Sequence, residues 1–338
     1  MVTIKDVAKK AGVNASTVSR VLKDSSAISQ NTKERVRQAM EELGYVPNLA
    51  AQMLASGLTQ CVGVVLPPLT TPDRVSEPFF MEILTAINDQ AKQQGFTVSI
   101  ATSNSVSDLA EQVKLMYRQK RADGFLILYS EKDDPVKNYL NQHRIPFVVI
   151  GTPSEDSPNL ISIDNDNQLM GEQAVLHLHR KGHKKILFVT DDLTSKVCLE
   201  RYRGYQRGVQ QQKLLEFPLL PFDRRDPLTL DQVIESIQKE KITGLIVIGD
   251  LLSVRVIQFL SYYGLRVPDD LSLISFNNSI FSKMLHPYLT TFDINVAQLG
   301  QTSLMQLISM IKGQPPTTSE VIVPFTLKER ESVRDLYR

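Results

Sequence analysis

Residues 3–22 read TIKDVAKKAGVNASTVSRVL, and this stretch decides the fold of the first part of the chain. Thr3 followed by Asp6 is typical of a capping box at the start of a helix. The apolar residues that follow recur at helical spacing, which predicts a first helix over residues 4–11. Gly12 ends that helix, because glycine adopts the left-handed backbone of a helix C-cap without strain.

Two more short helices are predicted after the first. Asn14 can cap a second helix over residues 15–22, whose valines and leucine share one face. Either Ser29 or Asn31 can open a third helix, and its apolar stripe ends before Gly44. A turn of about three residues between the first two helices is typical of a helix-turn-helix.

The outer face of the second helix is polar. Arginine can bond guanine bidentately, serine can donate or accept at a base edge, and alanine can meet a thymine methyl group. A polar face alone also fits a plain solvated surface, but the small Ala8, the short turn and the third helix favour entry into a major groove. Residues 1–60 are also basic, with eight Lys or Arg against five Asp or Glu. The side chains that project outward are Ala15, Ser16, Ser19 and Arg20.

A short alanine-rich segment follows the three helices. It reads LAAQMLASG over residues 49–57, with Asn48 as its cap and Gly57 as its end. A helix of this length is not stable alone. We therefore expect the segment to become ordered only on a partner.

From Cys61 onward the sequence changes to apolar runs separated by helical stretches. Strands that alternate with helices predict parallel sheets. Seven runs are many for one sheet, and the polar segment SPNLISIDNDN, residues 157–167, separates the fourth run from the fifth. We therefore predict two doubly wound lobes, with ligands bound where the carboxyl ends of strands face a cleft. The runs are VGVVLP, FTVSIAT, GFLILYS, FVVIG, KILFVT, GLIVIGD and LSLISF.

The composition is that of a globular protein, with 42% hydrophobic and 22% charged residues over 338 positions. The first residues lack the apolar core of an export signal and no stretch approaches the ~20 apolar residues of a membrane span, so we expect a cytoplasmic protein.

Cys61 and Cys198 are expected to be small buried hydrophobes. We expect no metal site at His177, His179 and His183, which straddle a helix end. We also expect neither an enzyme nor a cofactor, because no nucleophile elbow, phosphate loop or zinc spacing stands out.

Over its whole length the sequence resembles the LacI/GalR family of transcriptional regulators. The stretch quoted above, with TKERVRQAMEELGYVPN and AAQMLASG, resembles the family's DNA-binding headpiece and hinge. PFF, RADGFLIL, IDNDN, RYRGY, VPDDLSLISF and LTTFDINVAQLG resemble later landmarks in the same order. PFF, LYSEKDDP, DNDN and FDIN are most similar to the maltose-operon repressors of Gram-positive bacteria.

The resemblance implies an N-terminal all-α helix-turn-helix headpiece and an α/β two-lobed, periplasmic-binding-protein-like effector domain with parallel sheets. The second domain would bind the effector and form the dimer. The predicted boundaries are residues 1–46 for the headpiece, 47–60 for the hinge helix and linker, and 61–338 for the effector domain, whose N-lobe is about 61–162 and 293–322 and whose C-lobe is about 163–292 and 323–331.

The resemblance also implies which residues contact DNA. In the family, paired hinge helices lie in the minor groove and push a leucine into a base step, which bends the duplex. In this sequence that leucine is Leu54. The full set implied is Thr3, Ile4 and Lys5 near phosphates or base edges, Asn14, Ala15, Ser16, Thr17, Ser19 and Arg20 in the major groove, Tyr45 and Asn48 on the backbone, and Leu54.

For the effector, Arg201 in the R-x-x-G-Y pattern matches the family's sugar-contacting arginine, whose guanidinium offers five fixed donors. Asn277 stands where many relatives carry Asp, so hydroxyl recognition is retained but a charged acceptor is lost. Gly151 stands where relatives often have a side chain that reaches the ligand. A roomier cleft is implied, which suits a disaccharide or a longer sugar.

Four further residues are candidates for the effector site, each with an alternative. Phe79 or Phe80 and Tyr129 can supply the flat faces on which sugars stack, or they can be core residues. Asp250 can contact the ligand or cap the helix that follows it.

We therefore predict a homodimeric, sugar-responsive repressor of maltose or maltodextrin genes that binds a pseudo-palindromic double-stranded operator. One alternative is a catabolite-control regulator that uses a phosphorylated protein as corepressor. Another is a sugar-binding protein of the transport type, which would share the two-lobed fold. The tail SVRDLYR lacks leucine heptads, which weighs against a tetramerisation helix.

Overall fold

The chain forms two compact units, residues 1–59 and residues 60–338. They are seen in a computed structural model. It describes residues 2–22, 24–46, 57–68, 77–131, 133–152, 160–284, 286–314, 316 and 318–338.

The first unit, called the headpiece below, contains α1 (Ile4–Ala11), α2 (Ala15–Leu22) and α3 (Gln30–Leu43). The predicted bounds of the first two helices are confirmed. Of the two candidate caps for the third helix, Ser29 is the one that acts, since its Oγ accepts a hydrogen bond from Thr32 N at 3.4 Å. The core of the headpiece consists of Val7, Ala8, Ala11, Val18, Val21, Val36 and Ala39.

The second unit contains two sheets. In the first sheet the strand order is β11-β5-β4-β3-β1-β2, and every pair is parallel. Its strands are β1 (Cys61–Val65), β2 (Thr97–Ala101), β3 (Gly124–Ile127), β4 (Phe147–Ile150), β5 (Ile161–Asp164) and β11 (Glu320–Ile322).

In the second sheet the order is β12-β10-β9-β8-β6-β7, and only the pair β10–β12 is antiparallel among its described strands. The predicted pair of mainly parallel, doubly wound sheets is thereby confirmed. The strands of the second sheet are β6 (Ile186–Thr190), β7 (Leu220–Pro221), β8 (Gly244–Val247), β9 (Ser272–Phe276), β10 (Thr290–Asp293) and β12 (Thr326–Lys328).

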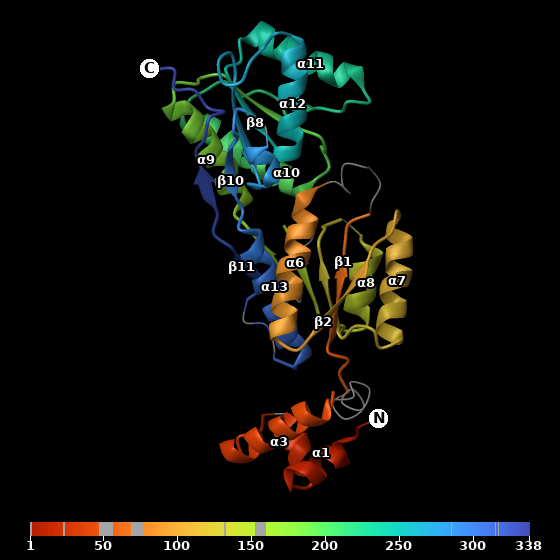
Figure 1. Ribbon diagram of the computed structural model, residues 1–338. Coiled ribbons are helices and arrows are strands. Elements are labelled where there is room, and N and C mark those ends of the chain that lie inside the picture. Colours follow the sequence, from red (N-terminus) through yellow and green to blue (C-terminus); the bar gives the residue numbers. More distant parts are fainter. Residues whose placement is uncertain are drawn as a thin grey trace. The chain divides into compact units, whose positions relative to one another are not determined.

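Helices cover both faces of each sheet. On the first sheet, α6 (Pro78–Gln93) and α13 (Val296–Ile311) lie on one face, and α7 (Val106–Arg118) and α8 (Pro135–Gln142) on the other (Figure 1). We call this sheet with its helices the first lobe. The second sheet with α9 (Asn167–Arg180), α10 (Lys196–Gln211), α11 (Pro227–Glu240) and α12 (Asp250–Tyr262) is the second lobe. A short 3-10 helix, η1 (Ile280–Lys283), follows β9.

The chain passes between the two lobes at three places. It leaves the first lobe between β5 and α9, returns between β10 and α13, and leaves again between β11 and β12. One continuous core cluster contains residues of both lobes, including Ile83 and Leu304 from the first and Phe188 and Tyr205 from the second.

Five strands were not among the seven predicted runs: β5, β7, β10, β11 and β12. β5 lies inside the segment that was interpreted as a polar separator. The reason is that these strands are only two to four residues long. In addition, β5 and β10 contain Ser, Thr or Asp, and β11 and β12 have mainly exposed positions. Such strands carry little apolar signal.

No helix in the described ranges is long and apolar enough to cross a bilayer.

Candidate functional site

The headpiece presents the predicted DNA-contacting face on α2. Its inner face is closed by Val18 and Val21, both buried. The opposite side of α2 is accessible to solvent, and Asn14, Ser16 and Arg20 are exposed there. Ala15, Thr17 and Ser19 are half-buried at the edges of this face, and Ala15 also packs against the headpiece core.

Most basic side chains of the headpiece have internal partners, which leaves a defined set for a polyanion. Lys10 pairs with Glu42 at 2.6 Å, and Arg37 lies 3.6 Å from Asp24. Within the described headpiece, the cations that form no ion pair include Lys5, Lys9 and Arg20. Phosphate groups attract such cations and make binding depend on salt.

Two basic residues brace the helix-turn-helix from behind, and sequence analysis missed both. Lys33 is buried, and its Nζ donates to the backbone O of Asp24 at 3.2 Å and to Oδ1 at 2.8 Å. Arg35 donates to the carbonyl oxygen of Ala11 at the end of α1. Their position on α3, facing the turns before and after α2, was the available signal.

The predicted contacts at the start and end of the headpiece lie at its surface. Thr3 donates to the carboxylate of Asp6 from its backbone N at 2.9 Å and from Oγ1 at 2.7 Å, which lowers the pKa of Asp6. Lys5 is exposed, whereas Ile4 and Tyr45 pack partly against the headpiece core.

The predicted hinge contacts are not among the residues that the structure describes. Asn48 and Leu54 lie outside the described residues.

The second candidate site is a polar cluster where strands of the two lobes end, with Arg201 at its centre. Arg201 comes from α10 and is only 5% exposed. Its Nε donates to Oδ1 of Asn167 at 2.9 Å, its Nη1 donates to the carbonyl oxygen of Ile248 at 2.9 Å, and the guanidinium lies 4.3 Å from the ring centroid of Phe276. Burial lowers the pKa of Arg201 to about 10, so the side chain stays charged at neutral pH.

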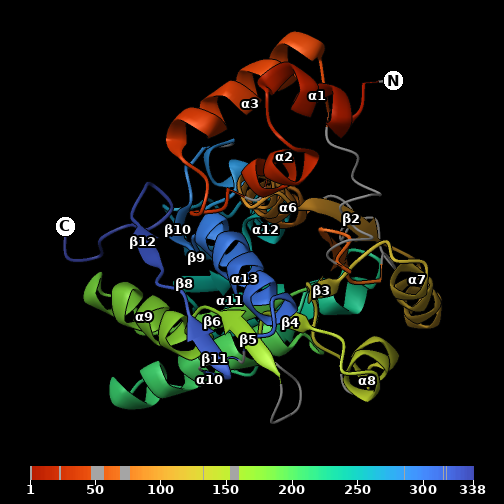
Figure 2. The same ribbon diagram turned by 90° about the horizontal axis from the view of Figure 1, so that it is seen from below.

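The position of Arg201 is set by the close packing of α9 against α10, which approach one another at glycine residues. α9 and α10 lie side by side (Figures 1 and 2). A Cβ at Gly171 would lie 1.9 Å from the backbone O of Arg201, and one at Gly204 would lie 1.9 Å from the backbone O of Gln168. Only glycine permits this approach, so the glycine of the R-x-x-G-Y pattern holds the arginine against α9.

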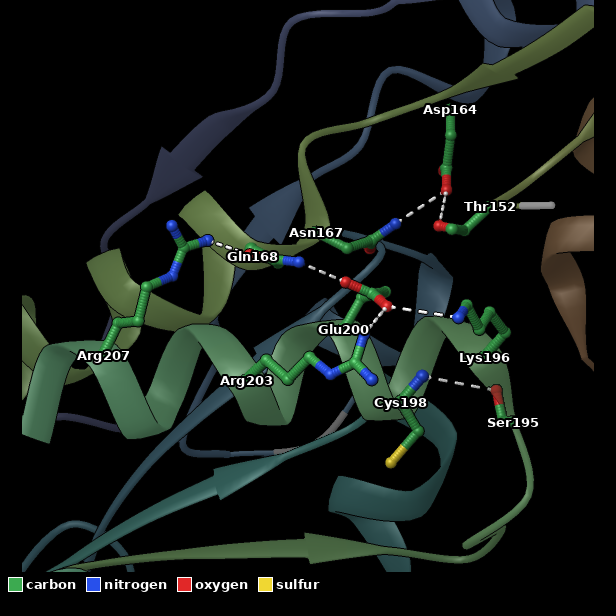
Figure 3. Close-up of polar contacts among 10 residues, drawn as sticks. All are labelled: Thr152, Asp164, Asn167, Gln168, Ser195, Lys196, Cys198, Glu200, Arg203 and Arg207. Atoms are coloured by element: carbon green, nitrogen blue, oxygen red, sulfur yellow. Dashed lines mark hydrogen bonds and ion pairs between the residues drawn. The ribbon is translucent and has the colours of Figure 1, made fainter. Parts of the chain in front are cut away.

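Asn167 connects Arg201 to the first lobe. Its Nδ2 donates to Oδ2 of Asp164 at 2.8 Å, and Thr152 donates to the same oxygen at 2.7 Å (Figure 3). Burial raises the pKa of Asp164, while the hydrogen bonds and Arg201 oppose that rise. The result is a continuous polar chain from Thr152 through Asp164 and Asn167 to Arg201.

Asp250, at the start of α12, fastens the strand ends of the second lobe. It is 1% exposed, and its carboxylate accepts from Ser275 Oγ, from Thr291 Oγ1 at 2.8 Å, and from the N and Oγ of Ser279 at 2.6 and 3.0 Å. Burial raises its pKa. The cap position of α12 is occupied by Gly249, so Asp250 ties β9 and β10 to the helix rather than capping it.

Asn277, directly after β9, faces the first lobe. Its backbone has φ +100°, a region in which asparagine is tolerated better than most residues. Its side chain hydrogen-bonds the carboxylate of Glu77, which precedes α6. Burial, with the charges of Asp250 and Asp191, raises the pKa of Glu77 to about 7. Sequence analysis missed Glu77, although it adjoins the PFF pattern.

The three aromatic candidates divide between two places. Phe79 and Phe80, at the start of α6, meet edge to face with centroids 5.5 Å apart, and both are half-buried beside the core cluster shared by the lobes. Tyr129 is buried in a different cluster and donates to Asp134 at 3.3 Å. The structure thus brings Arg201, Asp250 and Asn277 near Glu77 and the start of α6. Tyr129 is not part of this group, because it is buried in another core cluster and bonds Asp134.

A surface pocket of about 710 Å³ lies over α10, and Arg201 is not among its lining residues. Its lining residues Gln168, Arg203 and Arg207 bond one another or the neighbouring Glu200. Glu200 accepts from Gln168 and pairs with Arg203 at 2.6 Å and Lys196 at 3.5 Å, while Arg207 donates to Gln168 (Figure 3). These groups satisfy one another on the outside of the helix pair. We therefore place the candidate effector site at Arg201, where the strands end.

The remaining residues singled out in the sequence have internal roles. Cys61 and Cys198 are buried, as predicted. His183 bonds Thr243 and the backbone O of Arg334 through its two ring nitrogens, at 3.1 and 3.0 Å. His177 is buried beside Glu329, 3.9 Å away, and burial lowers its pKa. Among the residues that the structure describes, no group of His, Cys, Asp or Glu is arranged to hold a metal ion.

Two family models match this chain. Residues 3–48 match the model described as bacterial regulatory proteins, lacI family, and residues 175–333 match a periplasmic binding protein-like domain. The first match covers the three helices of the headpiece, and the second covers the segment that contains Arg201, Asp250 and Asn277.

Individual proteins resemble the chain over most or nearly all of its length. The HTH-type transcriptional regulator MalR of Staphylococcus xylosus is 31% identical over 98% of each chain. The crystal structure of the lac repressor dimer bound to operator and the anti-inducer ONPF has 27% identity and a TM-score of 0.77, over 98% of this chain and 99% of that one. A staphylococcal probable maltose operon transcriptional repressor has 25% identity and a TM-score of 0.75, over 82% of this chain and 99% of that one.

Proposed function

Because this chain belongs to the lacI family of bacterial regulatory proteins, we propose that it is a transcriptional repressor released from its operator by a neutral sugar, maltose or a maltodextrin. It acts as a homodimer and places one headpiece in each half of a pseudo-palindromic site. Likeness to the operator-bound lac repressor dimer supports this assembly.

In the headpiece, α2 reads bases and the unpaired cations hold the phosphates. Arg20 is the exposed side chain of α2 with the fork geometry that matches the O6 and N7 atoms of guanine. Lys5 and Lys9 supply attraction that does not depend on sequence. The residues Asn48 and Leu54 would complete the contact from the hinge.

The observation that carries the effector assignment is the fixation of Arg201. Asn167, Ile248 and Phe276 hold its guanidinium on three sides. A planar donor fork that is already oriented can bridge adjacent hydroxyl groups at little entropic cost. Asn277 both donates and accepts, and Phe79 and Phe80 offer apolar surface beside it. This combination suits a polyhydroxylated ligand.

Nearby carboxylates favour a neutral ligand over a phosphorylated one. The charges of Asp250, Asp191 and Glu82 help to raise the pKa of Glu77. Arg201 interacts with the charges of Asp250 and Glu77. An added phosphate would meet these like charges in a partly buried setting, which is costly. Maltose and maltodextrins carry no charge.

The sugar relieves repression because its binding is thermodynamically coupled to operator binding. A sugar bound at Arg201 favours one arrangement of the two lobes, and the arrangement that lets the hinge segments pair on DNA loses population. Coupling of ~1–3 kcal/mol is typical of such systems.

The proposed division of the chain is residues 1–46 for DNA, 47–60 for the hinge and 61–338 for effector binding and dimerisation. The N-lobe would comprise residues of about 61–162 and 293–322, and the C-lobe about 163–292 and 323–331. We also infer that the protein works in the cytoplasm and returns its sugar unchanged.

Thermal unfolding of the full-length protein with a panel of sugars tests the effector assignment. Maltose, maltotriose, glucose and glucose 6-phosphate are the ligands. A ligand at one hundred times its dissociation constant adds ~2.7 kcal/mol of apparent stability. We expect stabilisation by maltose or maltotriose and none by the phosphate ester. Stabilisation by the phosphate ester alone would contradict the assignment, as would consumption of the sugar during incubation.

A further inference from the structure

The three crossover segments between the lobes lie against one another. They are residues 164–167 between β5 and α9, residues 293–296 between β10 and α13, and residues 322–326 between β11 and β12. The backbone N of Val323 in the third segment donates to the backbone O of Asp164 in the first at 2.8 Å. Any change in the angle between the lobes has to be taken up in these segments.

One side chain reaches from the first crossover to both of the others. Asn165 is only 4% exposed, and its Nδ2 donates to the carbonyl oxygen of Ile294 at 3.0 Å and to that of Val323 at 2.9 Å. Both partners are carbonyl oxygens, so the NH₂ group of the amide, and not its oxygen, must face them. Both hydrogens of this NH₂ group therefore have an acceptor, one in each of the other two crossovers.

The same turn of chain holds the candidate effector residue. Asp164 and Asn167, on either side of Asn165, bond one another, and Asn167 accepts from Nε of Arg201. The backbone O of Asn165 lies 3.4 Å from Nδ2 of Asn167. Asn165 thus lies on the same hydrogen-bonded turn that holds Arg201.

We propose that Asn165 is the positioning residue that makes the three crossovers move as one, and thereby converts occupancy of the Arg201 site into a change of lobe arrangement. This rests on the proposed function for its ligand and its readout. Asn165 contacts neither the sugar nor the operator. Its loss uncouples the two sites while leaving each intact.

The main variant is Asn165→Asp, which keeps the shape and replaces the NH₂ donor by an oxygen that faces two carbonyl oxygens. Asn165→Ala removes the donor without adding charge, and it serves if the aspartate variant does not fold. The matched control is Asn295→Asp in the second crossover. The Nδ2 of Asn295 donates only locally, to Gln298 at 2.7 Å, and its Oδ1 acceptor survives the change.

Operator affinity of the full-length dimer is measured by fluorescence anisotropy with and without saturating maltotriose. The release factor is the ratio of the two dissociation constants. We expect Asn165→Asp to reduce this factor by roughly 2- to 30-fold, with sugar affinity and sugar-free operator affinity within about twofold of the unaltered protein. Asn295→Asp should keep the full factor. A full factor in both Asn165 variants would overturn the proposal.

Amide hydrogen exchange separates this proposal from the function it rests on, because it needs no sugar. We expect the amide of Val323 to exchange roughly tenfold faster in Asn165→Asp and Asn165→Ala than in the unaltered protein or in Asn295→Asp. If maltotriose fails to release the unaltered protein, the proposed function falls, and the exchange result alone decides the role of Asn165. Unchanged exchange at Val323 would refute that role.

Discussion

Asn167 holds Arg201 from one end of its amide and Asp164 from the other. Nε of Arg201 donates to Oδ1 of Asn167 at 2.9 Å, while Nδ2 of Asn167 donates to Asp164 at 2.8 Å. An amide that donates at one end and accepts at the other has one orientation, so the guanidinium is fixed before a ligand arrives. The side chain of Arg201 at the candidate effector site is therefore already oriented in this structure.

Replacing Arg201 by lysine should abolish most sugar binding while leaving operator binding intact. An ammonium group carries all its donors on one atom and lacks the planar fork by which Nε and Nη1 of Arg201 bond Asn167 and Ile248. We expect the sugar to bind about 1.5–3 kcal/mol more weakly, measured by calorimetry on the full-length protein.

The control for Arg201 is Arg203→Lys, on the outer side of the same helix, where Arg203 is exposed and pairs with Glu200. It should bind sugar like the unaltered protein. Equal losses in the two variants would show that α10 as a whole, rather than Arg201, governs binding.

Alanine at Gly204 should disrupt the α9–α10 crossing. The new Cβ would lie 1.9 Å from a backbone oxygen of α9, which cannot turn aside as a side chain can. We expect a loss of at least about 3 kcal/mol in the free energy of unfolding, measured with urea.

Gly244→Ala is the milder comparison for Gly204. Its nearest neighbour would be Cδ1 of Leu178 at 3.3 Å, the end of a flexible side chain. This variant should unfold close to the unaltered protein. If Gly204→Ala were equally well tolerated, close contact at Gly204 would not be what places Arg201.

Alanine at Arg20 should relax sequence specificity at one base pair of each half-site. Loss of a bidentate contact to guanine costs ~1–3 kcal/mol of discrimination against the wrong base. Anisotropy with operator duplexes changed at single positions measures this. Arg37→Ala removes another exposed cation, on α3, and should leave base preference unchanged. Identical base preferences in Arg20→Ala and the unaltered protein would contradict the assignment of α2.

Glu77 should make the protein less stable as pH rises towards neutrality. Its folded pKa is raised to about 7 from an ordinary value of 4.5, chiefly by burial. Between these values the folded state binds more protons than the unfolded state, so the free energy of unfolding falls with rising pH. Glu77→Gln should remove that loss and be more stable than the unaltered protein by roughly 1–3 kcal/mol at about pH 8.

Glu331 offers a control of opposite sign for Glu77. Hydrogen bonds from Tyr288 N and His286 lower the pKa of Glu331, so its contribution is present near neutral pH and is lost on acidification. Glu331→Gln should therefore have a lower free energy of unfolding than the unaltered protein at neutral pH, and this difference should shrink in acid. Urea unfolding of both variants across pH measures the two slopes. Parallel slopes for Glu77→Gln and the unaltered protein would rule out the role of Glu77.

The headpiece was predictable because its signals are local. Gly12 and Gly44 take left-handed backbones with φ +64° and +61°, and each ends a helix where a glycine does so at least cost. Most of the apolar strands were predictable for a similar reason, since β1, β3, β4, β6, β8 and β9 are buried throughout and read as continuous runs.

What the sequence could not show depends on partners far along the chain. Asn165 bonds residues that lie 129 and 158 positions away, and no spacing in the sequence relates them. Burial raises the pKa of Glu77 most, and the charges of Asp250 and Asp191, from the other lobe, add to that rise once they are folded next to it. The short strands β5 and β10 are stabilised by neighbours in their sheets rather than by their own apolar content.

The most direct test of the account is titration of maltose and maltotriose into a complex of the full-length protein with a palindromic operator duplex, followed by fluorescence anisotropy. The account predicts release of the duplex by at least one of these sugars, at concentrations that saturate the Arg201 site, and no release from the Arg201→Lys variant. Retention of the duplex by sugar-saturated protein, or equal release from the variant, would contradict it.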